Sequence, residues 1–137
     1  MTGFTEEFVE RLLRAAEAAR ANAHAPYSEF SVGAAVLDED GAIHVGCNVE
    51  NASFGLSVCA ERNAVAASVA AGGRGLAALV VITPARPPAS PCGACRQVLA
   101  EFGDFPVLLA NPDGERRMTS VSELLPDAFD RSVLESS

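Results

Sequence analysis

Basic residues are scarce in this sequence. The 137 residues contain 10 Lys and Arg against 18 Asp and Glu, so the formal net charge is -8 at pH 7. Binding of DNA, RNA or an anionic membrane requires clustered Lys and Arg side chains. The composition therefore argues against nucleic acid and membrane partners, and favours a small, uncharged or cationic substrate.

Long apolar runs and a secretory signal are also missing. No stretch of 18 apolar residues is present, so we expect no segment to span a membrane. The first residues, MTGFTEEF, carry acidic side chains where a signal peptide has basic ones. We expect a cytoplasmic protein, in which the four cysteines are reduced thiols or metal ligands rather than disulfides.

Length and hydrophobic patterning predict one domain over residues 1–137. Apolar residues at helical spacing begin after Thr5, a suitable N-cap, and Asp38 to Gly41 is a hairpin turn signal. Helices are expected at 4–19, 60–71, 91–103 and 121–125, and strands at 30–37, 42–49, 77–83, 106–110 and 116–119. Such alternation predicts an α/β fold, a three-layer α/β/α sandwich with a mixed five-stranded sheet.

Two short segments carry the chemistry, VCAER at 58–62 and SPCGACR at 90–96. In the second segment Ser90 is a natural N-cap and Pro91 a natural first helical residue. Cys92 and Cys95 then lie three residues apart on one helix face, so both sulfurs can reach one metal ion. Cys59 also lies at the start of an expected helix, where the helix dipole favours the thiolate.

Three cysteines beside a glutamate describe a catalytic zinc site. Three protein ligands leave the fourth tetrahedral position for water, and Glu61 can carry that water's proton. Zinc and three thiolates sum to -1, so positive charge is needed nearby, and the two helix N-termini, Arg62 and Arg96 can supply it. A structural zinc site and a redox pair at Cys92 and Cys95 are the alternatives, and the redox pair leaves Cys59 and Glu61 unexplained.

The fourth cysteine, Cys47, is not expected to bind the metal. If Asn48 and Glu50 face a ligand, strand alternation turns Cys47 and Val49 to the opposite side. Cys47 also lacks the helix-start position that favours a thiolate. A small buried thiol that fills space in the core is the preferred interpretation.

The chain resembles the small zinc-dependent nucleoside cytidine deaminases, which assemble as homotetramers. The Cys-Ala-Glu and Pro-Cys-x-x-Cys segments match a known signature of zinc deaminases. The resemblance extends over PYSEFSVGAAVL, GCNVENASFGLSVCAERNAV, SPCGACRQVL and SELLP, which is nearly the whole chain. It implies a five-stranded α/β/α fold, one Zn²⁺ per subunit, and hydrolysis of cytidine and deoxycytidine to uridine and deoxyuridine in pyrimidine salvage.

The resemblance also implies a role for each matching residue. Cys59, Cys92 and Cys95 would bind zinc, zinc-bound hydroxide would attack C4 of cytosine, and Glu61 would act as the proton shuttle. The remaining roles are ribose binding by Asn48 and Glu50, packing of Phe30 on the pyrimidine, a backbone contact from Ala60, a hydrogen bond from Arg62 to a zinc-bound sulfur, and entry of Phe129 into the pocket of a neighbouring subunit.

Two positions depart from the family pattern, and one related activity remains an alternative. Phe54 stands where Tyr is common, so a hydroxyl contact is lost there, and Asn63 is less usual after CAER. A deaminase of a modified cytosine nucleoside, such as an aminoacyl-nucleoside antibiotic, would share the zinc site. A polynucleotide deaminase is disfavoured by the negative charge.

Overall fold

The computed structural model describes residues 4–135, which are built around one five-stranded sheet. Its strands are β1 (Gly33–Leu37), β2 (Ile43–Cys47), β3 (Ala78–Ile82), β4 (Pro106–Ala110) and β5 (Arg116–Ser120). The order across the sheet is β2-β1-β3-β4-β5. Strands β3 and β4 pair in parallel and the other neighbours pair antiparallel, which confirms the mixed sheet.

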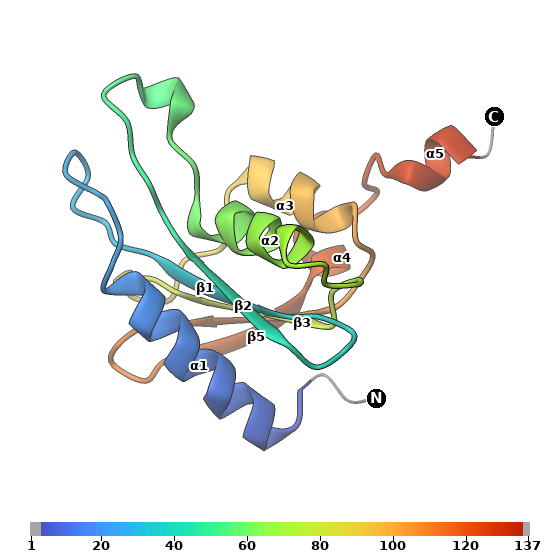
Figure 1. Ribbon diagram of the computed structural model, residues 1–137, viewed down its shortest axis with the longest axis horizontal. Helices are drawn as coiled ribbons and strands as arrows, with labels where there is room; N and C mark the ends of the chain where they lie inside the picture. Colours follow the sequence, from blue (N-terminus) through green and yellow to red (C-terminus); the bar gives the residue numbers. More distant parts are fainter. Residues whose placement is uncertain (1–3, 136–137) are drawn as a thin grey trace.

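Helices cover both faces of this sheet (Figure 1). Helix α1 (Glu6–Arg20) packs on one face, and α2 (Ala60–Ala70) and α3 (Gly93–Ala100) pack on the other. The short helices are η1 (Phe54–Leu56), α4 (Val121–Leu124) and α5 (Arg131–Glu135). The three-layer α/β/α sandwich is confirmed. No helix within residues 4–135 is long and apolar enough to cross a membrane.

Alternation along the central strands divides the core into two layers. On β3, Leu79 and Val81 face the layer that contains Ala60 and Leu99, whereas Val80 faces the layer beneath α1. Both layers are apolar because β1 and β3 are buried on both faces. The core therefore fixes α2 and α3 firmly over the same side of the sheet.

A close approach between β2 and α2 holds the first turn of α2 against the sheet. A Cβ atom at Gly46 would lie 2.6 Å from the carbonyl oxygen of Ala60 and 2.4 Å from the backbone nitrogen of Ala64. Any larger residue at position 46 would push the helix away, so glycine is required for this contact. The first turn of α2 is thereby held against the strand.

Several predicted boundaries were wrong, and long-range hydrogen bonds explain two of them. Residues 30–32 do not extend β1, because the Asn48 side chain binds the Val32 amide and the Phe30 carbonyl in place of a neighbouring strand. Helix α3 begins at Gly93 with Cys92 as its N-cap, so Ser90 is not the cap and Pro91 is not the first helical residue. The Ser90 hydroxyl accepts instead from Arg117.

Candidate metal centre and active site

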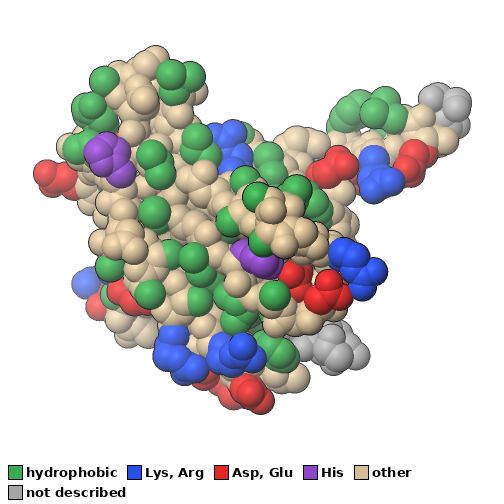
Figure 2. Space-filling model, in the orientation of Figure 1, with side chains coloured by type: hydrophobic (Ala, Val, Ile, Leu, Met, Phe, Trp, Pro, Cys, Tyr) green, Lys and Arg blue, Asp and Glu red, His purple; other side chains and the backbone are tan. Residues whose placement is uncertain are grey.

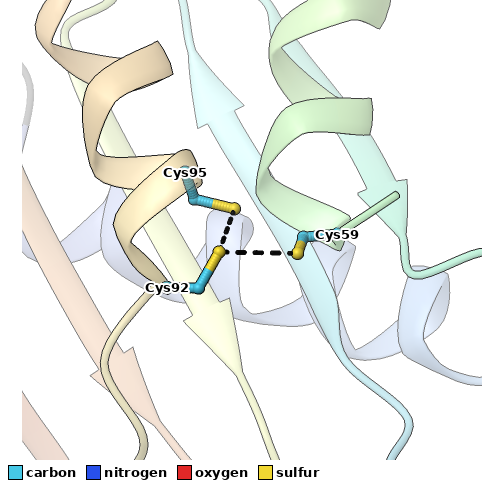
Figure 3. Close-up of side chains that lie close together, drawn as sticks. All are labelled: Cys59, Cys92 and Cys95. Carbon is cyan, nitrogen blue, oxygen red and sulfur yellow. Dashed lines mark hydrogen bonds between the residues drawn. The ribbon is translucent and has the colours of Figure 1, made fainter. Parts of the chain in front are cut away.

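Cys59 and Cys92 occupy equivalent places in two different helices. Each is the N-cap residue of its helix, Cys59 for α2 and Cys92 for α3, and neither thiol makes a side-chain capping bond. Cys95 lies in the first turn of α3 and is fully buried. The three sulfurs face one another between the two helix starts (Figure 3). Both cap thiols are therefore available to a metal ion.

The spacing of the sulfurs fits zinc. Cys59 Sγ lies 3.8 Å from Cys92 Sγ, and Cys92 Sγ lies 3.5 Å from Cys95 Sγ. Tetrahedral Zn²⁺ with bonds of about 2.3 Å holds its sulfur ligands about 3.8 Å apart. Among residues 4–135, no fourth Cys, His, Asp or Glu joins the group, so Cys47 lies outside it as expected. Three thiols leave one coordination position open.

The pKa of the Cys59 thiol is lowered by its neighbours in the cluster. A hydrogen bond from the Cys95 thiol lowers the pKa of Cys59 to about 6, helped by Cys92 and by the positive charge of Arg62. The same hydrogen bond, together with burial, raises the pKa of Cys95. The Cys59 thiol therefore ionises more readily than an ordinary cysteine, and the thiolate is the form that binds zinc.

Arg62 is the cation beside this negative cluster. Its Nη2 donates to the Ser57 carbonyl oxygen at 3.4 Å. Its Nε is buried and has no hydrogen-bond partner among the described residues. Arg96, the other candidate cation, is occupied by the carbonyl oxygens of Pro91 and Leu124, at 2.8 and 2.7 Å. Arg62 thus has one N–H donor without an acceptor in the described part of the chain, whereas the guanidinium of Arg96 binds two backbone carbonyl groups.

Glu61 lies two residues after Cys59, in the first turn of α2. Its side chain is 5% exposed. Burial, with a smaller contribution from the Cys59 charge, raises the pKa of Glu61 to about 7, although its own backbone amide and the charge of Arg62 oppose the shift. A carboxyl group with a pKa near neutrality can both accept and donate a proton, which general acid and base catalysis requires.

A pocket of about 390 Å³ opens beside the cysteines. Its lining residues are Ser28, Phe30, Val32, Asn48, Glu50, Cys59, Ala60, Glu61, Thr83, Ala89, Ser90 and Cys92. The structure thus brings together Phe30, Asn48, Glu50, Ala60 and Glu61, five of the residues singled out in the sequence. A pocket of this size is in the usual range for small-molecule sites.

The polar end of the pocket is held by a network around two side chains. Glu50 accepts from the backbone amides of Tyr27 and Ser28 at 3.0 and 3.2 Å, and from the Ser28 hydroxyl. The Ser28 hydroxyl in particular holds the pKa of Glu50 below its ordinary value. Asn48 accepts from the Val32 amide at 2.9 Å and donates to the Phe30 carbonyl at 2.8 Å.

Each polar group keeps some capacity for a ligand. A carboxylate offers about four acceptor positions and an amide offers two donors and two acceptors. The three bonds to Glu50 leave it about one acceptor position. Asn48 keeps one donor and one acceptor, because two of its positions are used.

Three of the predicted residues do not line this pocket: Cys95, which is buried beside Cys92 in the metal-binding group, Arg62 and Phe129. Phe129 is 62% exposed on the tail that leads to α5, and its carbonyl accepts from Gln97 at 2.7 Å. The tail carries α5 away from the body of the molecule (Figure 1), and apolar side chains are visible on this arm (Figure 2). Phe129 therefore does not reach the pocket of its own chain.

Sequence reasoning missed several lining residues, notably Ser28, Thr83 and Ala89. Ser28 lies within the PYSEF segment, but its bond to Glu50 joins positions 22 residues apart. Thr83 is a polar residue directly after a buried strand and before a proline-rich loop. A polar residue at the end of a buried strand could have indicated that Thr83 lines the pocket.

Comparisons with known proteins agree with this geometry. Residues 6–110 match the family model described as the cytidine and deoxycytidylate deaminase zinc-binding region. A cytidine deaminase of Sporosarcina psychrophila is 48% identical over 128 residues, which are 92% of this chain and 94% of the relative. A cytidine deaminase of Mycobacterium tuberculosis is 48% identical over 111 residues, 81% of each chain.

Solved structures give the same answer. The crystal structure of a cytidine deaminase from Burkholderia pseudomallei superposes with a TM-score of 0.85 at 50% identity, covering 92% of this chain and all of the other. Sequence similarity to cytidine deaminases thus extends over most of this chain, which also has the mixed sheet and the three-cysteine group. The chain belongs to the family of zinc-dependent cytidine and deoxycytidylate deaminases.

Proposed function

We propose that this protein hydrolyses cytidine and deoxycytidine to uridine and deoxyuridine with release of ammonia. The observation that carries the proposal is the buried Glu61 carboxyl beside a three-cysteine group, in a pocket that also holds Asn48 and Glu50. The named relatives are cytidine deaminases, and their similarity covers most of this chain.

Cys59, Cys92 and Cys95 would hold one Zn²⁺, which as a Lewis acid would lower the pKa of the attacking water. Glu61 takes a proton from the attacking water and delivers it to N3 of cytosine. It then takes the proton of the new C4 hydroxyl and gives it to the amino group, so that the C4–N bond breaks, ammonia leaves, and the C4 oxygen remains as the carbonyl of uracil. A pKa of about 7 suits Glu61 to both directions of transfer.

The other end of the pocket would bind the sugar. The free acceptor position of Glu50 and the remaining donor and acceptor of Asn48 suit two ribose hydroxyls, which both donate and accept. Phe30 and the Ala60 backbone would hold the pyrimidine between them. Glu50 remains ionised, because its hydrogen bonds lower its pKa, and therefore disfavours a phosphate on the sugar.

We also propose a homotetramer with shared active sites, in which Phe129 enters the pocket of a neighbouring subunit. The support is its 62% exposure on an arm that leaves the body of its own chain (Figure 1). We further propose that residues 1–137 form one catalytic domain, and that the protein acts in pyrimidine salvage in the cytoplasm. Arg62 would donate a hydrogen bond to a metal-bound sulfur. The unused Nε donor of Arg62 supports its assignment.

The test is loss of cytosine absorbance with zinc-loaded protein. We expect turnover of cytidine and deoxycytidine, a much lower kcat/KM for cytidine monophosphate, and no turnover of adenosine. A preference for an aminoacyl-nucleoside antibiotic over cytidine would favour the alternative substrate class. If zinc binds but no nucleoside is deaminated, the proposed function is wrong.

A further inference from the structure

Thr83 lies at the point where the central sheet meets the active site. Its backbone amide donates to the Ala110 carbonyl at 3.1 Å, so the parallel pairing of β3 with β4 continues through this residue. Its side chain is 4% exposed and forms part of the pocket lining. The sheet therefore fixes the backbone of Thr83, and the side chain lies between the sheet and the pocket.

The hydroxyl of Thr83 closes the loop that follows it. Its Oγ1 accepts from the backbone amides of Ala85 and Ala89, at 3.3 and 3.4 Å. The bond to Ala89 spans six residues and bends the proline-rich segment back onto the end of the strand. No other acceptor is recorded for the Ala89 amide among the described residues. The hydroxyl thus holds the loop backbone at Ala89.

The far end of the same loop is a wall of the pocket. Ala89 and Ser90 line the pocket, and Cys92 follows as a member of the metal-binding group. The loop is also attached from behind, where Asn111 donates to the Ala85 carbonyl at 3.1 Å. Asn111 holds the first part of the loop, and Arg117 donates to the Ser90 hydroxyl near its far end at 3.4 Å. Between these two attachments, the Thr83 hydroxyl holds the backbone at Ala89.

We propose that Thr83 is a positioning residue, whose buried hydroxyl sets the wall formed by Ala89 and Ser90 against the bound nucleoside. The inference rests on the proposed deaminase function. The wall contacts the substrate but carries no proton-transferring group, because Glu61 lies on α2 instead. Displacing the wall should therefore weaken substrate binding more than it slows the chemical step.

Three variants isolate the hydroxyl. Thr83→Val keeps the shape and removes the hydroxyl, while Thr83→Ser and Thr83→Ala both lack the methyl group and differ in the hydroxyl alone. We expect Val and Ala to raise the KM for cytidine roughly tenfold, with kcat changed less than about threefold. Ser should remain near wild type. The Ser and Ala pair keeps the comparison usable if the Val variant does not fold.

Thr119→Val is the matched control, because Thr119 is a buried threonine on β5 that does not line the pocket. Zinc content should be unchanged in all four variants. The inference is overturned if Val and Ala have the wild-type KM, if Ser is as impaired as Ala, or if Thr119→Val raises KM equally.

A second measurement separates this inference from the proposed function. Amide hydrogen exchange at Ala89 should be faster by about tenfold or more in Thr83→Val than in wild type, since the amide loses its acceptor. This result does not depend on catalysis. Unchanged exchange would overturn the positioning role, whereas a wild-type protein without deaminase activity would overturn the proposed function.

Discussion

Replacing Glu61 by Gln separates proton transfer from metal binding. Gln has nearly the same shape as Glu but cannot carry a proton from water to the base. We expect the variant to retain zinc, because the three thiols are unchanged, and to lose roughly 10²–10⁴-fold in kcat. At 1.36 kcal/mol for each tenfold change, this loss corresponds to about 3–5 kcal/mol of barrier.

The structure also predicts an effect of this variant on the metal-free protein. Burial raises the pKa of Glu61 from its ordinary value of 4.5 to about 7. Between these two values the folded state holds a proton that the unfolded state has released, so stability falls as the pH rises from 4.5 to 7. A shift of this size corresponds to roughly 3 kcal/mol. The metal-free Gln variant should therefore be more stable than metal-free wild type at pH 8, and the difference should shrink towards pH 4.5.

The measurements are cytidine turnover by absorbance, zinc content by elemental analysis, and urea unfolding of the metal-free proteins. Glu7→Gln is the matched control, because Glu7 is exposed on α1, across the sheet from the pocket. Near-normal turnover by a zinc-loaded Glu61→Gln variant would show that Glu61 is not the proton carrier. An identical pH dependence of stability in wild type and variant would refute the argument from burial.

Three further changes test other parts of the structure. Cys47→Ser should leave zinc content and activity largely intact, because Cys47 lies outside the metal-binding group. Cys92→Ser should lose zinc. Loss of zinc from folded Cys47→Ser protein would contradict the three-ligand site. Phe129→Ala should lower activity while the protein remains assembled in solution, since the side chain would act in a neighbour's pocket; a fully active monomeric wild type would contradict this. Asp38→Asn should destabilise the fold at pH 7 by about 1–3 kcal/mol, the usual worth of hydrogen bonds to a charged group. Although burial opposes its ionisation, hydrogen bonds from His44 and from the Ala42 and Asp40 amides lower the pKa of Asp38. This stabilisation is present above the ordinary value of 3.8 and is lost as the pH falls through the lower folded value, so denaturant unfolding should show the difference shrinking only in strong acid.

The metal-binding group could be predicted because its geometry is mostly local. Cys92 and Cys95 share a helix turn, and Cys59 begins a helix that alanine-rich sequence makes easy to identify. The buried strands β3 and β4 were equally clear, since each is an uninterrupted apolar run. That the two helices lie side by side over the sheet was expected from the resemblance rather than from spacing.

The supporting contacts could not be predicted, because they join distant parts of the chain. Ser90 and Pro91 have the composition of a helix start, but Arg117 takes the Ser90 hydroxyl and the helix begins later. Phe30 fits the apolar strand pattern, yet Asn48, 18 residues away, donates to its carbonyl oxygen, and β1 begins only at Gly33. In both cases a side chain from elsewhere overrides a local preference.

The two helix starts show how the fold accommodates a demanding metal site. Cysteine is not among the favoured N-cap residues, and Ser or Asp at Cys59 or Cys92 would be worth about 1 kcal/mol to each helix. Both helices forgo that bond, since neither thiol caps its own first turn. In return, the two helix N-termini place partial positive charge beside three thiolates, which together with zinc carry a net charge of -1. Because Arg96 is committed to backbone carbonyls, Arg62 is the side-chain cation that remains to share this task. Because the thiols do not cap the helices, the positive ends of both helices remain available to the metal-binding group. A change of either cysteine to a better N-cap residue would stabilise a helix but remove a metal ligand.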